Sequence, residues 1–422
     1  MSFDPEQHLN SLEPIGWKLG LERMNLLCDE LGRPQDRFGT IHVVGTNGKS
    51  SVTRMAAALL GAHGLKAGCV ISPHLSHWSE RVLVDGRDLA PGAFANSVAR
   101  TAEAAARVDA RLEPGDAVTQ FELSVAAGFL ALAEAGVEVA AIEAGLGGRL
   151  DATNSIDSSV TALTSIGLDH TEWLGETELE IAGEKLAVLR TGTTLVVGAL
   201  PDEVGQLARE TAAARGCRVV EAAPESGQPM ELAVRGGFQR MNFAVAVAAV
   251  ESYLDSTGVD SDRLDAAEVR RAALAVRVPG RLEQLGTDPP LFVDVAHNRQ
   301  GAAALAAALP EVAGDRPVTA LIALLTDKDS DGILAELAPA LDSVIFTSLL
   351  PAALANAGRP GASTRSADEL EAIANRLGLA ARVATDASSG LARAKELAAQ
   401  GDGVVLIAGS HFLLAALEEI WQ

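Results

Sequence analysis

The chain has 422 residues, more than one hydrophobic core usually supports, so we expect two domains. Hydrophobic residues make up 48% of the sequence and aromatic residues 4%, which is typical of helices packed on a parallel sheet. The formal net charge of −22 argues against a nucleic-acid partner, because such binding needs clustered Lys and Arg to neutralise phosphates. A nucleotide held by a local glycine-rich loop stays compatible with this charge.

Three widely spaced cysteines, Cys28, Cys69 and Cys217, form no CxxC pair, which argues against a disulfide scaffold or a structural zinc site. The polar, acidic start of the chain does not resemble a signal peptide, and no apolar run is long enough to span a bilayer. We therefore expect a cytoplasmic protein without a membrane partner.

The first elements have the order that a phosphate-binding loop requires. A helical pattern over residues 17–32 is followed by a β-type run over 40–44, a polar turn with glycine, and an apolar helix over 52–60. Strand, loop and helix in this order place backbone N–H groups at a helix start, where they can bind phosphate.

Two later strands, predicted over 137–142 and 160–166, also end at polar residues. The first runs into Glu143 and a Gly-rich turn, and the second runs into Asp169 and His170. Catalytic groups in open α/β sheets gather at the carboxyl ends of strands, so we expect these side chains to lie near the loop after residue 44.

The last third of the chain repeats the pattern, with strands predicted over 291–293, 318–325 and 404–408. Residues 276–290 are rich in Pro and Gly and indicate a linker or hinge, so we place the domain boundary near Arg281. Domains are therefore expected over residues 1–280 and 281–422. The Ala-rich stretches 95–110 and 301–309 are predicted to be helices.

The turn after the first strand reads Gly45-Thr46-Asn47-Gly48-Lys49-Ser50-Ser51. It contains GK[ST] but lacks the first glycine of GxxxxGK[ST], because position 43 is Val. Glycines let backbone N–H groups approach phosphate, Lys49 supplies charge, and the hydroxyls after it can reach Mg²⁺. An ordinary Gly-Asn turn is the alternative. The surrounding pattern favours an α/β protein with a P-loop-type, mainly parallel sheet ATPase domain followed by a smaller Rossmann-like domain.

Three further motifs are each ambiguous when taken alone. They are Ser72-Pro73-His74 with Glu80-Arg81, the run EAGLGGRLDATN over residues 143–154, and Asp169-His170-Thr171 with Glu184-Lys185. Ser-Pro commonly starts a turn, a single His is commonly structural, and a single Lys on a helix is commonly solvated.

Taken together, the motifs resemble the folylpolyglutamate synthase and dihydrofolate synthase family, within the wider Mur ligase group. The matching strings run in order from about residue 17 to 412 and include IHVVGTNGKSS, ISPHL, FELSVAAGF, EAGLGGRLDATN, LDHTEWLG, GGFQRMN, PGRLE, DVAHN, TDKD and GSHF. The resemblance implies an ATP-dependent ligase that joins L-glutamate to a pteroate or folate carboxylate through an acyl phosphate, releasing ADP and phosphate. It further implies small-molecule partners only, and we expect a monomer.

The resemblance also assigns residues to roles. ATP contacts are expected from Asn47, Gly48, Lys49, Ser50, Ser51, Asn242, Arg281, Asp294 and His297. Ligands for Mg²⁺, expected to be two ions, are Ser51, Ser72, Glu143, His170 and Lys185. The catalytic residues are Lys49, Glu143, His170 and Lys185. Lys185 matches a lysine that such ligases carry as a carbamate; a simple ion pair with Glu184 or Glu180 is the alternative.

Pterin contacts are expected from Leu21, Glu22, Thr119, Phe121, Asp151 and Ala152. Core packing of Phe121 and turn capping by Asp151 are the alternatives for those two side chains. Retention of these segments makes us favour a bifunctional enzyme. The second domain is expected to hold L-glutamate, ATP is expected at the domain junction, and closure about residues 276–290 is expected to gate the reaction.

Five positions depart from the family's common pattern: Ser50 for Gly, Ile71 for Thr, Trp78 for Phe, Val125 for Thr and Arg299 for Pro. Because several fall near the expected folate side, an altered substrate preference is one interpretation. A related Mur-type ligase acting on a non-folate carboxylate is the first rival, although its usual amino-terminal domain has no counterpart in the roughly forty residues before the loop. A catalytically silent nucleotide-binding regulator is the second, and the four catalytic residues argue against it.

Overall fold

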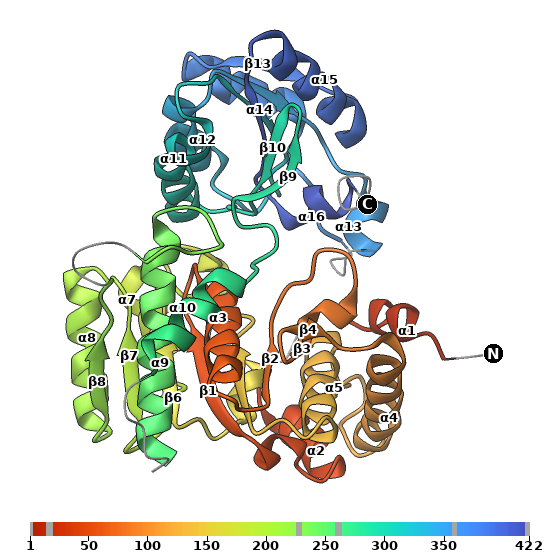
Figure 1. Cartoon of the computed structure of the whole chain (residues 1–422). Helices are drawn as coiled ribbons and strands as arrows, with labels where there is room; N and C mark the ends of the chain where they lie inside the picture. Colours follow the sequence, from red (N-terminus) through yellow and green to blue (C-terminus); the bar gives the residue numbers. More distant parts are fainter. Residues whose placement is uncertain (1–2, 14–19, 225–229, 258–263, 357–360, 418–422) are drawn as a thin grey trace. The chain divides into compact units, whose positions relative to one another are not determined.

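The computed structural model describes residues 3–13, 20–224, 230–257, 264–356 and 361–417 (Figure 1). The chain forms two compact units. Unit 1 comprises Met1–Ala233 and Gln239–Arg277, and unit 2 comprises Val234–Phe238 and Val278–Gln422. No helix in the described part of the chain combines the length and apolarity needed to cross a bilayer.

Unit 1 is built on a sheet with the order β4-β3-β2-β5-β1-β6-β7-β8 (Figure 1). Strands β2, β5, β1, β6, β7 and β8 run parallel, and β3 and β4 add an antiparallel edge. Parallel strands end at one edge of a sheet, so the loops after β1, β2, β5 and β6 meet there. The strands are β1 (Gly39–Val44), β2 (Ala67–Val70), β3 (Val82–Val84), β4 (Arg87–Asp88), β5 (Val139–Glu143), β6 (Val160–Leu163), β7 (Thr194–Val197) and β8 (Arg218–Glu221).

The helices of unit 1 cover this sheet, and α3 packs against β1, β2 and β5 with α10 beside it. The helix α3 begins at Lys49, which is earlier than the start at residue 52 that the sequence predicts. The helices are α1 (Pro5–Ser11), α2 (Glu22–Glu30), α3 (Lys49–Ala62), α4 (Pro91–Asp109), α5 (Gln120–Glu134), α6 (Thr171–Leu174), α7 (Glu178–Leu186), α8 (Asp202–Ala214), α9 (Phe238–Thr257) and α10 (Ala266–Ala275), with 3-10 turns η1 (Pro34–Arg37), η2 (Trp78–Arg81) and η3 (Ala152–Ser155).

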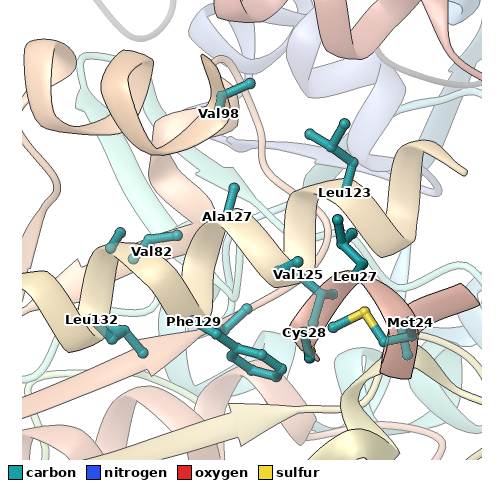
Figure 2. Close-up of a cluster of buried hydrophobic side chains, with 14 of the residues drawn as sticks. Met24, Leu27, Cys28, Val82, Val98, Leu123, Val125, Ala127, Phe129 and Leu132 are labelled. Atoms are coloured by element: carbon teal, nitrogen blue, oxygen red, sulfur yellow. The ribbon is translucent and has the colours of Figure 1, made fainter. Parts of the chain in front are cut away.

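A hydrophobic cluster between α2, α4, α5 and the sheet forms one core of unit 1 (Figure 2). Leu123 and Phe129 of α5 are buried there, and full burial of a side chain of this size contributes roughly 1.5–3 kcal/mol. Val125 is labelled in the same cluster in Figure 2 and is also buried. Its departure from the family's Thr therefore lies in the core, where a hydroxyl would need a hydrogen-bond partner.

Unit 2 has a sheet with the order β13-β12-β11-β14-β10-β9, parallel except for β9. Its core lies between the sheet and the helices that flank it. The strands are β9 (Glu283–Thr287), β10 (Pro290–Val293), β11 (Val318–Ile322), β12 (Ser343–Phe346), β13 (Ala380–Val383) and β14 (Val404–Ala408). The helices are α11 (Arg299–Ala313), α12 (Ser330–Leu337), α13 (Pro351–Asn356), α14 (Ala367–Arg376), α15 (Ala387–Gln400) and α16 (His411–Ala415), with the 3-10 turn η4 (Ala338–Ala340). The α/β prediction is confirmed in both units.

The interpretation of residues 276–290 as a linker is wrong in its second half. Residues 283–287 form β9, which pairs antiparallel with β10. The strand has a neighbour on one side only, and an edge position tolerates the glycine at 286 that hid it from pattern reading. The predicted hinge therefore contains a hairpin strand that belongs to the second sheet.

Several other predicted elements differ from the structure in their bounds. The strand predicted over 318–325 ends at Ile322. The helix predicted over 17–32 begins at Glu22, and residues 17–19 lie outside the described part of the chain. Strand β6 ends at Leu163 and not at residue 166. Thr164 and Ser165 leave the sheet because their side chains bond the loop after β1, as described below.

Candidate active site

The loop between β1 and α3 is fixed by hydrogen bonds to the segment after β6. The hydroxyls of Thr164 and Ser165 donate to the Asn47 carbonyl oxygen at 2.6 and 3.0 Å, and the Asn47 N–H donates back to the Ser165 hydroxyl at 3.1 Å. The Thr46 N–H donates to the Ser165 carbonyl at 2.8 Å. Sequence reasoning missed Thr164 and Ser165, because both fell inside the strand predicted over 160–166.

Gly48 occupies a conformation that only glycine adopts without strain, with φ of +85°. A Cβ atom at this position would collide with the side-chain amide of Asn242, which projects from the second turn of α9. The amide is held at this place because its nitrogen donates to Gln239 at 2.9 Å. The structure therefore brings Asn242 against the phosphate loop, 194 positions away in the sequence (242 − 48).

Glu143 lies at the end of β5 and is 2% exposed. Its carboxylate accepts a bond of 2.9 Å from the Ser50 hydroxyl and one of 3.0 Å from the Ser72 backbone N–H. Three strand ends, those of β1, β5 and β2, thus meet at one carboxylate. Ser51, the hydroxyl assigned to the metal by resemblance, is buried on α3 beside Ser50.

Lys185, near the end of α7, is 4% exposed. Burial, together with the positive charge of Lys49, lowers the pKa of its ammonium from 10.5 to about 7, and the charges of Asp169 and Asp151 partly oppose this change. The Lys185 amine therefore feels the charges of two other predicted site residues, Lys49 and Asp151, and of Asp169. Among the described residues, none forms a hydrogen bond or ion pair with this ammonium.

The ordinary interpretation of Lys185 as an ion-pair partner of Glu184 or Glu180 is wrong, because both carboxylates are engaged elsewhere. Glu184 accepts from Arg149 at 2.9 Å. Glu180 forms the capping box of its own helix with Thr177.

His170 stands at the start of α6 in a left-handed conformation, with φ of +51°. Its backbone N–H donates to the Asp169 carboxylate at 3.0 Å, and its side chain is 32% exposed. A non-glycine residue held at positive φ carries strain, and such residues gather at functional sites. The partly exposed His170 side chain is therefore accessible to a ligand.

The predicted pterin residues lie in two neighbouring segments of unit 1. Phe121 lies against Gly145, because a Cβ on that glycine would collide with the ring. Asp151 is 5% exposed and already accepts from the Leu146 N–H at 2.8 Å and the Thr153 N–H at 2.9 Å. Burial raises the pKa of Asp151, and these hydrogen bonds oppose that shift. Asp151 therefore caps the turn that follows it, and Phe121 packs against the core. These are the alternatives that the sequence left open for the two side chains.

The remaining pterin candidates have mainly structural partners. Thr119 caps α5, its hydroxyl donating to Glu122 at 2.9 Å, and that carboxylate also accepts from the buried Arg23 at 3.0 Å. Ala152 is buried, Leu21 is the residue before α2, and Glu22 is exposed. Arg23, the next residue of α2, forms an ion pair with Glu122 that links α2 to α5.

Three predicted ATP contacts lie in unit 2. Asp294, at the end of β10, accepts from the Leu282 N–H and the Ala296 N–H, both at 2.8 Å, and is 4% exposed. Burial raises the pKa of Asp294, and the Arg281 guanidinium opposes the change. The Nδ1 atom of His297 bonds the Val295 carbonyl at 2.8 Å. The structure brings these residues together within unit 2, around the turn that carries Arg281.

The phosphate loop with α3, the Glu143 carboxylate at the end of β5 and the loop after β2 converge in unit 1. This arrangement fits an ATP-dependent ligase of the Mur type. The family comparison agrees: residues 43–243 match the Mur ligase middle domain, and residues 280–411 match the Mur ligase glutamate ligase domain.

Individual relatives narrow this class. The chain is 35% identical to the dihydrofolate synthase/folylpolyglutamate synthase of Mycobacterium tuberculosis over 78% of its own length and 74% of the relative's. It superposes on a folylpolyglutamate synthase of that organism complexed with ADP and AMPPCP, with a TM-score of 0.87, 30% identity and 99% and 97% of the two chains covered. It also superposes on a bifunctional folylpolyglutamate synthase/dihydrofolate synthase from Yersinia pestis, complexed with AMPPNP and an Mn ion. That comparison has a TM-score of 0.83 and 29% identity and covers 100% of this chain and 99% of the other. The chain belongs to the dihydrofolate synthase/folylpolyglutamate synthase family and is an ATP-dependent ligase.

Proposed function

We propose that the chain uses ATP to join L-glutamate to the carboxylate of a pterin-bearing acid, and that it accepts both dihydropteroate and a reduced folate. The observation that carries this proposal is the buried Glu143 carboxylate, held by Ser50 of the loop helix and by the Ser72 backbone. Support for both acceptors comes from relatives named for the two activities and from the retained segments around Thr119, Phe121 and Asp151.

The chemistry explains why a phosphate loop is needed. A carboxylate is a poor acyl donor, because oxide would have to leave. Transfer of the γ-phosphoryl group to a carboxylate oxygen gives an acyl phosphate; the glutamate nitrogen then attacks the acyl carbon, the bond to the phosphate oxygen breaks, and the amine loses a proton. Lys49 neutralises the moving phosphoryl group and the loop N–H groups hold the chain of phosphates, so positioning and charge supply most of the acceleration.

The side chains at Glu143 fit a divalent cation that is completed by phosphate oxygens. Mg²⁺ is usually bound by one or two carboxylates plus substrate phosphates, and the described residues hold no cluster of three or more His, Cys, Asp or Glu that would suit an all-protein cage. Glu143, Ser51, Ser72 and His170 would hold the ion, which would neutralise charge on the phosphate oxygens. The count of two ions stays a prediction.

Lys185 is proposed to carry a carbamate. A neutral amine attacks the carbon of CO₂, an N–C bond forms, and loss of one proton leaves an anion that can bind a cation. The pKa of about 7 makes a large fraction of the amine neutral at neutral pH, whereas an ordinary lysine is almost fully protonated. An anion at this place would also face the positive charge of Lys49. The adduct should therefore form above pH 7 and be lost as the pH falls below it.

Unit 2 is proposed to supply Arg281, Asp294 and His297 to the nucleotide and to hold L-glutamate. The match of residues 280–411 to a glutamate ligase domain supports this role. Within the unit, the Asp294 carboxylate fixes the backbone at Leu282 and thereby presents the neighbouring Arg281.

Phosphate release from the purified chain tests the proposal. The assay contains ATP, Mg²⁺, L-glutamate and either dihydropteroate or a reduced folate, with each component omitted in turn and Lys49→Met as the inactive control. Release that requires both organic substrates, with both acceptors, is the expected result. Turnover with only one of the two acceptors would contradict the proposal that the enzyme is bifunctional. No turnover with any pterin would favour the Mur-type rival, and ATP binding without turnover on any carboxylate would favour the silent regulator.

A further inference from the structure

Arg81 lies at the same sheet edge as Glu143, and its guanidinium is held in place by contacts with Trp78 and His74. The guanidinium carbon lies 4.0 Å from the centroid of the Trp78 ring. The Arg81 Nε donates to the His74 Nδ1 at 2.9 Å, and the His74 ring lies 4.6 Å from the Trp78 ring. Stacking and one directed hydrogen bond therefore fix the plane of the guanidinium.

The two terminal NH₂ groups of the guanidinium are the part of Arg81 that this geometry does not use. The Nε–H donates to His74, and no described residue accepts from the two terminal NH₂ groups. The residue is partly exposed, so a ligand can reach it. A planar pair of N–H donors in this position matches the two oxygens of a carboxylate.

The acidic side chains nearby are committed to other partners. Glu6 accepts from the Trp78 N–H at 3.0 Å. Glu80 accepts from the N–H groups of residues 75–77 at 2.8 to 2.9 Å. Glu143 is held by Ser50 and the Ser72 backbone. Burial lowers the pKa of Arg81 and these three carboxylates oppose the change, yet none of them forms an ion pair with the guanidinium.

The order of strands decides which reactant faces Arg81. At this edge the sheet reads β3-β2-β5-β1, with the phosphate loop on β1 and Glu143 on β5. Arg81 is the last residue of η2, directly before β3, and its carbonyl oxygen accepts from the Ile71 N–H at 2.9 Å beside the end of β2. The phosphate loop and Arg81 therefore lie on opposite sides of Glu143. Phe121, the aromatic candidate for the acceptor, contacts Gly145 just beyond Glu143.

We propose that Arg81 binds the reactive carboxylate of the pterin-bearing acid through its two terminal NH₂ groups and holds it beside Glu143 for phosphorylation. This inference rests on the proposed function and names the group that receives the carboxylate. Trp78 is the positioning residue. Its ring replaces the phenylalanine usual in the family and gives the guanidinium a stronger stacking partner, because Trp is the best aromatic partner for a cation.

Equilibrium binding with two matched ligands tests the assignment. Dihydropteroate and its carboxamide, which differ only at the carboxyl group, are titrated into the full-length protein with Mg²⁺ and a non-hydrolysable ATP analogue. The variants are Arg81→Gln, Arg81→Lys and Trp78→Phe, with Arg107→Gln as the control. Arg107 is an exposed arginine of unit 1 that pairs with Glu30 on the surface.

Arg81→Gln should weaken dihydropteroate binding about 10- to 150-fold, the range expected for hydrogen bonds to a charged group, and leave the carboxamide unchanged. The affinity of Arg81→Lys for dihydropteroate should lie between those of the wild type and Arg81→Gln, because the charge stays and the paired donors are lost. Trp78→Phe should weaken the acid about two- to fivefold. Arg107→Gln should bind both ligands as the wild type does.

Three results would overturn the assignment. Equal weakening of acid and carboxamide would show a purely structural role, and unchanged binding of both would show no role. Weaker binding of the ATP analogue, with dihydropteroate unaffected, would make Arg81 a phosphate ligand. If the wild type binds neither pterin ligand while it binds the ATP analogue, the folate function itself fails, and Arg81 loses its proposed ligand with it.

Discussion

Replacing His42 by glutamine should remove a defined part of the acid sensitivity of unit 1. His42 lies in the middle of β1 and is 1% exposed, and its Nε2 atom bonds the Thr153 hydroxyl at 2.9 Å. That hydroxyl donates in turn to Asp151 at 2.5 Å, so the imidazole is neutral and donates its Nε2 proton. Burial, together with the positive charge of Arg190, lowers the pKa of His42 from 6.5 to about 3.

The sign of the effect follows from proton binding. Between pH 6.5 and pH 3 the unfolded chain binds a proton at this histidine and the folded chain does not, so lowering the pH favours unfolding. At pH 5 the difference amounts to about 2 kcal/mol, from 1.5 pH units at 1.36 kcal/mol each, and at pH 7.5 it is close to zero. His42→Gln keeps a donor for Thr153 but cannot take up a proton.

Urea unfolding of the wild type and His42→Gln at pH 7.5 and pH 5 measures this pH-dependent part of the free energy of unfolding. The variant loses packing and is expected to be less stable than the wild type at pH 7.5, but its deficit should shrink by about 2 kcal/mol at pH 5. Ile41→Val, in the same strand and fully buried, is the matched control, since its deficit of about 1 kcal/mol should be the same at both pH values. A deficit for His42→Gln that does not change with pH would refute the reasoning.

Three further predictions concern the site. Lys185→Ala should lower kcat by at least about 100-fold, because the amine is the carbamate carrier, and short carboxylates such as acetate should restore part of it; wild-type turnover in a steady-state assay would exclude the role. Ser50→Gly, the family's residue, should weaken apparent Mg²⁺ affinity about tenfold in a kinetic titration by freeing one oxygen of Glu143, and an unchanged affinity would contradict this. Gly48→Ala should lower nucleotide affinity at least tenfold in calorimetry, and Gly48→Ala combined with Asn242→Ala should recover only part, because the positive φ remains strained.

Sequence reasoning located the strand ends well, because buried parallel strands are continuous apolar runs and the polar residues that follow them are conspicuous. Glu143 and Lys49 could therefore be assigned to one edge before the structure was known. The bond between Ser50 and Glu143 could not, since it depends on which of two adjacent hydroxyls on α3 faces β5. Periodicity places a residue on a helix but does not set its side-chain partner.

The segments that were missed share a physical cause. Strand β9 contains glycine and lies next to a Pro-Pro pair, so local propensity indicated a loop, and only pairing with β10 makes it a strand. Thr164 and Ser165 continue an apolar run in the sequence but turn away to bond the phosphate loop. In both cases a contact made by distant residues overrides the local pattern, and a single sequence carries no record of such contacts.

Two departures from the family pattern become related once the structure is considered. Ser50 bonds Glu143 from the side of β1, and Trp78 supports Arg81, whose guanidinium feels the charge of the same carboxylate from the side of β3. A carboxylate fixed by an additional hydroxyl loses less entropy when a cation binds, and a guanidinium fixed on a larger ring loses less when an anion binds. If the two substitutions act on one reaction centre, their effects must depend on each other. The double variant Ser50→Gly/Trp78→Phe should then lower kcat/KM by a factor that differs from the product of the two single effects. If the two substitutions act independently, the factor for the double variant should equal that product.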